Sequence, residues 1–196
     1  KKPSLYNCFT DYTKAFDSVW HDGLWAVFRS YGVPDKLVRL LSLLYANSKM
    51  AIRINNTLGE WFEAEIGSRQ GDPISPIAFI TLLERVMEKV ECETENVGVN
   101  IQGTRIKDLR FADDIDLLTE HGPDLQAALT NLNVSSKRFG LKINRSKTKV
   151  MIMSRRPVQT DPIVIEGEQV EQVTEFVYLG SLITSINDCT PEIRRR

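Results

Sequence analysis

The stretch LRFADDIDLL, from Leu109 to Leu118, places two adjacent carboxylates, Asp113 and Asp114, inside an otherwise apolar run. A short apolar run of this kind predicts a buried strand. Two like charges about 5 Å apart repel each other by roughly 3 kcal/mol at an effective dielectric constant of about 20. Because an unpaired buried pair is costly, we expect a positive group to lie beside these two side chains.

Asp113 and Asp114 lie in the turn between the predicted strands LRFA and IDLLT. An Asp-Asp pair at such a place is in the simplest case a polar turn pair. Asp11 closes the first predicted strand, SLYNCFTD, so it too lies at a strand end. If the two elements are neighbours in one sheet, the three carboxylates meet and provide oxygen ligands for Mg²⁺. Two such ions would stabilise both oxygens of an in-line displacement at phosphorus.

Composition limits the function classes. The chain has 196 residues and 42% hydrophobic content, as expected for globular material of one or two domains. No apolar run approaches the roughly 18 residues that span a bilayer, and the start of the chain lacks a signal-peptide core. We therefore expect an intracellular protein with no membrane partner. The three cysteines are far apart and odd in number, which fits neither a disulfide framework nor a zinc site, and the two histidines have no metal-ligand spacing.

Charge is distributed unevenly along the chain. The net charge of −1 gives no general argument for nucleic acid as a partner. The segment from Lys137 to Thr160 nevertheless contains eight basic residues and no acidic one. On charge alone, a solvated basic face explains this segment as well as a nucleic-acid contact does. These residues are Lys137, Arg138, Lys142, Arg145, Lys147, Lys149, Arg155 and Arg156.

Hydrophobic periodicity predicts a mixed order of helices and short strands. The pattern favours helices over residues 22–32, 34–45, 75–91 and 123–140, and the closing PEIRRR stops without a helix cap or a closing turn. It favours strands over 4–11, 99–106, 109–112, 115–119, 149–153, 162–167 and 176–183, with a hairpin on either side of NNTLGE within residues 50–67. This order indicates an α+β domain with a central antiparallel sheet.

Five motifs stand in a fixed order: FTDYTKAFDSV, RQGDPISPIAF, FADD, GLKINRSKTKVM and FVYLG. Together they resemble the reverse transcriptase palm of LINE-type, non-long-terminal-repeat retrotransposons, over nearly the whole chain. The resemblance implies an α+β polymerase palm, with an antiparallel sheet packed on helices, fingers incomplete and thumb absent. Residues 1–196 would form one partial domain, from the first palm motif through the primer-grip hairpin.

The resemblance also implies an enzyme, an RNA-directed DNA polymerase (a nucleotidyltransferase) of a transposable element. Its partners would be an RNA template, a DNA primer and deoxynucleoside triphosphates. Its cofactor would be magnesium, as two Mg²⁺ ions with Mn²⁺ as a substitute. Fingers, thumb and endonuclease regions would belong to a longer polyprotein, acting in the nucleus, the cytoplasm or both.

Catalytic roles follow from matching the motifs residue by residue. Asp11 and Asp113 match the principal metal ligands, with Asp114 beside them. Lys147 matches the lysine that protonates the leaving pyrophosphate as general acid. Apart from the resemblance, Lys147 is one more solvated lysine. The chemistry implied is positioning and electrostatic stabilisation, without a covalent intermediate.

Substrate contacts are implied in the same way. Phe16 matches the bulky residue that blocks a ribose 2′-hydroxyl, although it is also explained as a core aromatic. Arg69, Gln70 and Gly71 in RQGDPISP match the loop that approaches the nucleotide and template base, although the prolines also explain a helix-leading loop. Asp72 departs from the residue often found there.

The stretch Tyr178, Leu179 and Gly180 matches the hairpin that grips the primer 3′ end, or is an ordinary strand turn. Two other interpretations of the chain stay open. The first is a catalytically inert or co-opted retrotransposon remnant that acts as a nucleic-acid or protein interaction module. The second is a viral RNA-dependent RNA polymerase palm. Phe16 argues against the viral polymerase, because ribonucleotides need room at that position.

Overall fold

The computed structural model describes residues 4–46, 48–64, 66–69, 71–93, 97–154, 158 and 160–196. The predictions for Gln70, Arg155 and Arg156 fall outside these residues. Across the described residues, no helix is both long enough and apolar enough to cross a membrane.

A central sheet organises the fold. Within the described residues it has five strands in the order β11-β8-β1-β7-β6. The middle strand β1 pairs antiparallel with both β7 and β8, as predicted for an α+β domain, whereas the edge strand β11 pairs parallel with β8. The strands are β1 (Leu5–Thr10), β6 (Asp108–Phe111), β7 (Asp114–Thr119), β8 (Lys149–Met153) and β11 (Glu171–Gln172).

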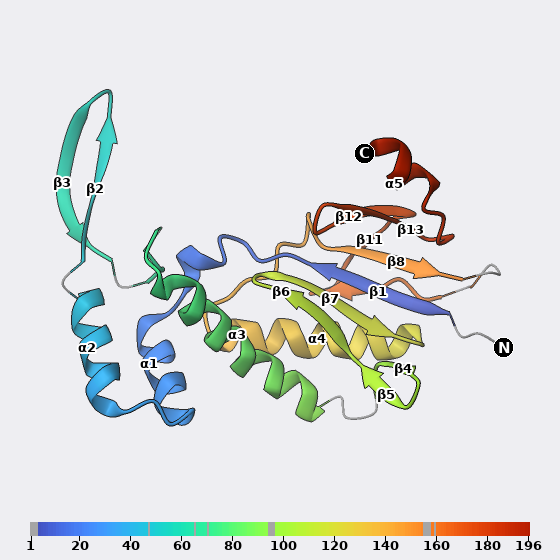
Figure 1. The fold of residues 1–196 in the computed structure, drawn as a ribbon, viewed down its shortest axis with the longest axis horizontal. Helices are drawn as coiled ribbons and strands as arrows, with labels where there is room; N and C mark the ends of the chain where they lie inside the picture. Colours follow the sequence, from blue (N-terminus) through green and yellow to red (C-terminus); the bar gives the residue numbers. More distant parts are fainter. Residues whose placement is uncertain are drawn as a thin grey trace.

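The long helix α4 (Gly122–Arg138) lies along one face of this sheet, against β1 and β7, and the long helix α3 (Ile74–Glu93) packs against α4 (Figure 1). The start of α3 is stabilised by Asp72, whose Oδ1 accepts a hydrogen bond from the Ile74 amide at 3.0 Å. The main core lies between helices and sheet, and its fully buried side chains include Cys8, Phe79, Leu82, Ile115, Leu129 and Leu132. Because the sheet is anchored by this core, the strand ends that carry the carboxylates are held in place.

The opposite face of the sheet is covered by a hairpin of β12 (Glu175–Tyr178) and β13 (Ser181–Thr184), as Figure 1 shows. The Phe176 ring stacks on Phe9 of β1, with ring centroids 4.3 Å apart. A final helix, α5 (Thr190–Arg195), follows β13 and is not among the helices that the sequence pattern predicts. Glu192 explains the helix, because its carboxylate accepts a hydrogen bond from the Leu182 amide at 2.8 Å and pairs with Arg195 and Arg196.

The amino-terminal half adds a smaller layer beside α3. A short 3-10 helix, η1 (Phe16–Ser18), leads into α1 (His21–Ser30) and α2 (Asp35–Ala46). After α2, the hairpin of β2 (Lys49–Ile54) and β3 (Thr57–Glu63) projects away from the rest of the molecule (Figure 1). Its turn is the pair Asn55 and Asn56, with φ of 47° and 66°, so the strands reach further into NNTLGE than predicted.

Short two-residue and three-residue strands complete the structure. One pair, residues 99–106, precedes β6 in the chain, and the other, residues 164–169, contacts α4 and precedes the edge strand β11. These strands are β4 (Val99–Ile101), β5 (Thr104–Ile106), β9 (Val164–Ile165) and β10 (Glu168–Gln169).

Candidate active site

Three carboxylates meet at one end of the central strands. Asp11 follows directly after β1, Asp114 is the first residue of β7, and Asp113 lies in the turn between β6 and β7. The register pairs Thr10 with Ile115, so Asp11 and Asp114 come next along the same ladder. Residues opposite each other in antiparallel strands share a face, and this face also carries the rings of the β12–β13 hairpin. The predicted gathering of Asp11, Asp113 and Asp114 is therefore present in the fold.

The negative charges of the three carboxylates repel one another, and Lys147 attracts them. The pKa of Asp114 is raised, first by burial and then by the negative charges of Asp113 and Asp11, while Lys147 lowers it. Lys147 Nζ lies 3.3 Å from Asp11 Oδ2, so this ammonium is a positive group of the kind that the sequence led us to expect. The lysine side chain is 65% exposed, and such a pair is worth at most about 1 kcal/mol. Lys147 thus offsets only part of the repulsion.

Backbone contacts hold Lys147 at this position. The Asn144 amide donates to the Asp11 carbonyl at 2.7 Å, and the Thr13 amide donates to the Lys142 carbonyl at 2.8 Å. Within the loop, Thr148 N donates to the Asn144 carbonyl at 2.9 Å. The loop that carries the lysine is therefore attached directly to the segment that carries Asp11.

The carboxylates fit a divalent cation only in part. Among the side chains that the structure describes, no group of three or more His, Cys, Asp or Glu is arranged to bind a metal ion. Asp11 Oδ1, however, is buried and has no hydrogen-bond partner in that part of the chain, a costly state for an anionic oxygen. Mg²⁺ commonly takes one or two protein carboxylates and completes its shell with substrate phosphates and water. Asp11 with the Asp113–Asp114 pair suits that incomplete kind of site.

Phe16 lies in η1, five residues after Asp11, and is partly buried. Its ring packs against Phe79 of α3, with centroids 4.7 Å apart. Its carbonyl accepts hydrogen bonds from the Ser68 amide at 2.7 Å and the Ser68 hydroxyl at 3.1 Å. The ring is therefore supported by the core while part of it stays exposed, as the core-aromatic interpretation expects, and the role in sugar selection stays a prediction.

The loop before α3 is attached to α2 and to α1. Arg69 donates hydrogen bonds to the Leu44 carbonyl and the Ser48 hydroxyl, and its guanidinium lies over the Tyr45 ring, 5.3 Å from the centroid. Gly71 is exposed and has a φ of 84°, which favours glycine. His21, for which the sequence predicts no role, has Nε2 2.7 Å from the Gly67 carbonyl. No sequence signal links these two residues, because they are 46 positions apart.

The Tyr178 hairpin lies on the carboxylate face of the sheet. The Tyr178 hydroxyl donates to the Leu109 carbonyl at 3.1 Å, and its ring lies 5.5 Å from Phe9. Burial raises the pKa of Tyr178 to about 12, with smaller contributions from the charges of nearby aspartates. Leu179 and Gly180, with φ of 48° and 79°, form the turn. The predicted primer-grip segment is thus a tight turn fixed above the strand that leads to the carboxylates.

Sequence reasoning missed a fourth carboxylate, Asp116, which is only 2% exposed. The Asn7 side-chain amide donates to Asp116 Oδ2 at 2.8 Å, and burial raises the pKa of Asp116 to about 7. Asp116 stands two residues after Asp114 in a strand, so both side chains share a face. This spacing in DDIDLL was the signal that would have placed a fourth acid on the carboxylate side of the sheet.

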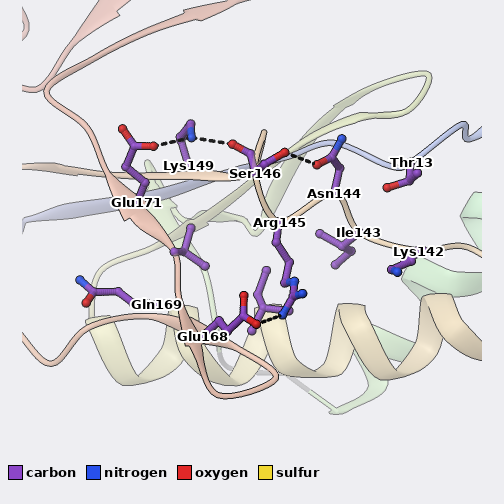
Figure 2. A pocket seen from close by; sticks show the side chains of 12 residues that line it. Thr13, Lys142, Ile143, Asn144, Arg145, Ser146, Lys149, Glu168, Gln169 and Glu171 are labelled. Carbon is purple, nitrogen blue, oxygen red and sulfur yellow. Dashed lines mark hydrogen bonds and ion pairs between the residues drawn. The ribbon is translucent and has the colours of Figure 1, made fainter.

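Three residues of the basic run pair with acids that follow it in the sequence. Figure 2 shows the polar pocket beside the Lys147 loop, of about 570 Å³, with Lys149 between Glu171 and Ser146. Arg145 pairs with Glu168 at 2.9 Å, Lys149 pairs with Glu171 at 2.6 Å, and Lys137 pairs with Glu166. The segment that carries β9, β10 and β11 therefore neutralises part of the charge of this run.

Comparisons with known proteins extend this geometry. The model of the family described as reverse transcriptase (RNA-dependent DNA polymerase) matches residues 1–183. The chain is 29% identical over 195 residues to a retrovirus-related Pol polyprotein from the type-1 retrotransposable element R2 of Nasonia vitripennis, covering 94% of this chain and 19% of that protein. It is 27% identical over 191 residues to the corresponding polyprotein from the type-2 element R2DM of Drosophila melanogaster, covering 93% and 18%. The chain thus spans about a fifth of the length of these relatives.

Solved structures with the same fold include telomerases. Telomerase from Candida albicans in complex with a telomeric RNA fragment superposes with a TM-score of 0.68 at 9% identity, covering 96% of this chain and 30% of that chain. Apo telomerase from Candida tropicalis gives a TM-score of 0.66 at 12% identity, covering 95% and 32%. At these identities the likeness concerns the fold, and it agrees with the α+β polymerase architecture expected from the motifs. With its family model matched over nearly the whole chain, the protein belongs to the reverse transcriptase family.

Proposed function

We propose that this chain forms the catalytic palm of the RNA-directed DNA polymerase of a non-long-terminal-repeat retrotransposon. The observation that carries the proposal is the meeting of Asp11, Asp113 and Asp114 at one end of the sheet, with Lys147 Nζ 3.3 Å from Asp11. Family membership and the resemblance to retrotransposon polyproteins support it. One structural neighbour was solved with a telomeric RNA fragment, which supports an RNA template as a partner. The reaction would take place in the nucleus, the cytoplasm or both.

In this proposal the protein contributes mainly placement and charge. Two Mg²⁺ ions, or Mn²⁺ in their place, would neutralise phosphate charge and activate the primer hydroxyl when bound by these carboxylates. Asp11 supplies the buried oxygen that has no partner in the described chain, and the Asp113–Asp114 pair supplies the facing oxygens. Lys147 acts as the general acid, and its Nζ donates a proton to the leaving pyrophosphate.

The remaining residues position the substrates. Phe16 excludes the 2′-hydroxyl of a ribonucleotide, and the turn from Tyr178 to Gly180 holds the primer 3′ end over the carboxylates. Arg69, Gln70 and Gly71 contact the incoming nucleotide and the template base, and Gly71 allows close backbone approach. The product is a primer longer by one deoxynucleotide, with pyrophosphate released.

The test is primer extension on an RNA template with deoxynucleoside triphosphates and Mg²⁺. We compare the wild type with the paired variant Asp113→Asn plus Asp114→Asn, which keeps size and removes charge. We expect a loss of at least roughly 100-fold, the size of effect seen when a main electrostatic group is removed from an active site. A matched control, Asp124→Asn in the first turn of α4, should keep wild-type extension.

Binding of Mn²⁺ separates the proposal from an inert or co-opted remnant. Wild-type protein should bind Mn²⁺, and the variant Asp113→Ala plus Asp114→Ala should not. Equal binding by both proteins, with no extension by either, would refute the catalytic proposal and support an interaction module. Extension that survives the paired substitution would also refute it.

A further inference from the structure

Two segments that are far apart in the sequence, residues 16–20 and 66–68, run along each other. The Gly67 amide donates to the Val19 carbonyl at 2.8 Å, and Trp20 forms a bridge with Ile66. Next to them, Ser68 donates twice to the Phe16 carbonyl, from its amide at 2.7 Å and from its hydroxyl at 3.1 Å. The segment that carries Phe16 is therefore fixed by the loop that leads to α3.

Gly67 permits this contact because it has no side chain. A Cβ at this position would lie 3.0 Å from the Asp17 carbonyl oxygen and 3.3 Å from the Asp17 Cα. The glycine also has a φ of 93°, a conformation that other residues rarely adopt. Any larger residue would have to push the Asp17 backbone away, and with it the adjacent Phe16.

The other side of Gly67 is held as well. Its carbonyl lies 2.7 Å from His21 Nε2, and the His21 ring packs edge-on against Tyr45, with centroids 5.1 Å apart. Gly67 is thus held by its amide on one side and by its carbonyl on the other. The loop has little freedom to move with the Phe16 segment, so it acts as a fixed support.

The Phe16 ring itself rests on Phe79 of α3, a side chain with no exposed surface. Its backbone is set by Ser68 and Gly67, and its ring by the core. A residue that excludes one hydroxyl group does so by contact distance, and a displacement of about 1 Å is enough to change reactivity by roughly 100-fold. The support of Phe16 therefore matters as much as its size.

Building on the proposed polymerase function, we infer that Gly67 and Ser68 are positioning residues for sugar selection. They act through Phe16 and not on the nucleotide, by holding its backbone where the ring meets the 2′ position. The chemical class that they discriminate against is ribonucleoside triphosphates.

The test measures the dissociation constants of dGTP and GTP for the full chain in the presence of Mn²⁺. The readout is the dissociation constant of GTP divided by that of dGTP, so a lower ratio means weaker selection against the ribonucleotide. The variant Phe16→Ala shows how far the ratio falls when the ring is absent. We expect Gly67→Ala to lower this ratio about tenfold, and Ser68→Ala to lower it about fivefold, the value of one hydrogen bond. Binding of dGTP should change by less than about twofold, because the effect is a gain of GTP binding.

Two further variants separate positioning from general damage. Ser68→Thr restores the hydroxyl and has room for its methyl group in the pocket of about 460 Å³ that Ser68 also lines, so it should restore the ratio. Ser30→Ala removes another serine hydroxyl that donates to a backbone carbonyl, in α1, and should leave the ratio unchanged. If Gly67→Ala does not fold, the ratio measured for Ser68→Ala decides the inference, provided that this variant still binds dGTP like the wild type.

Each remaining outcome is decisive. A changed ratio in Phe16→Ala with wild-type ratios in both Gly67→Ala and Ser68→Ala would overturn this inference and leave the polymerase proposal standing. A wild-type ratio in Phe16→Ala would show that Phe16 does not select the sugar, and it would overturn the roles of Gly67 and Ser68 as well. Wild-type protein that binds neither nucleotide would overturn both this inference and the proposed function.

Discussion

The central sheet and the β2–β3 hairpin are built from similar alternating sequences but have different surroundings. In β1, every residue from Tyr6 to Thr10 is buried, because helices cover one face and the β12–β13 hairpin covers the other. In β2 and β3, nearly every residue is exposed, including Ile54 at 67% and Trp61 at 62%. Alternation therefore predicts a strand in both places, while burial depends on what packs against each face.

The comparison also separates two kinds of carboxylate within the sheet. Asp116 lies inside, under the Tyr178 hairpin, whereas Asp11, Asp113 and Asp114 lie at the strand ends with partial exposure. Acids on the projecting hairpin, such as Glu63, lie in water. The deeper the carboxylate, the more its charge costs the fold, and this ordering is open to measurement.

The largest difference between the two regions should be the loss of stability when a large apolar side chain is shortened to alanine. Leu129→Ala removes a side chain with no exposed surface and should lower the free energy of unfolding by about 2–5 kcal/mol. Ile54→Ala on the hairpin should change it by less than about 0.5 kcal/mol. Urea denaturation of both variants provides the comparison. Similar losses would mean that the hairpin is buried in the folded protein.

The next effect concerns Asp116. Because its pKa is raised to about 7, the folded protein keeps a proton that the unfolded chain releases near pH 4. The free energy of unfolding should therefore fall as pH rises from about 4 to about 7 and level off above. Asp116→Asn should remove this slope and stabilise the protein at pH 8 by on the order of 2–4 kcal/mol. Glu63→Gln is the control, and a slope that persists in Asp116→Asn contradicts the assignment.

A smaller gain is expected at the strand ends. The raised pKa of Asp114 means that its charge destabilises the fold as pH rises through that pKa, and that this cost vanishes in acid. Asp114→Asn should raise the free energy of unfolding slightly at pH 8, by well under about 1 kcal/mol after solvent screening, while it abolishes primer extension. Urea denaturation and primer extension measure the two effects. Asp188→Asn should bring no gain, because hydrogen bonds from Thr190 lower the pKa of Asp188. Lower stability of Asp114→Asn would mean that the carboxylate is attracted, not repelled.

The smallest effect is local to the projecting hairpin. Asn56 has a φ of 66° in a two-residue turn, where Asn-Gly is the preferred pair. Asn56→Gly should increase amide-exchange protection in β2 and β3 by a few tenths of a kcal/mol, with global stability unchanged. Increased protection in β1 as well would show that hairpin and sheet unfold together.

Much of the fold followed from periodicity. The α4 helix, predicted over 123–140, runs from Gly122 to Arg138, because Pro123 opens it and Gly140, with a φ of 78°, follows its end. The helix α5 and the parallel pairing of β11 did not follow. The α5 helix depends on contacts of Glu192 with β13, and β11 consists of two residues whose pairing depends on the position of β8. Neither leaves a periodic signal.

The site was predictable where strand ends carry acids, and less so where distant loops meet. Asp11 and the Asp113–Asp114 pair were expected to meet because each closes or opens a strand. The contact between His21 and Gly67 depends on how α1 and the loop before α3 pack. The basic run looked unpaired because Glu166, Glu168 and Glu171 begin just beyond it, so a window of local charge ends before the neutralising acids.

The burial of Cys8 in the middle of β1 gives the protein a built-in reporter of unfolding. Its thiol has no exposed surface and its pKa is raised by burial, so a thiol reagent cannot reach a reactive thiolate in the folded state. Cys92 and Cys189 are exposed and should be labelled at once. The delayed labelling of one cysteine per chain would then time the opening of the central strand, without any introduced probe.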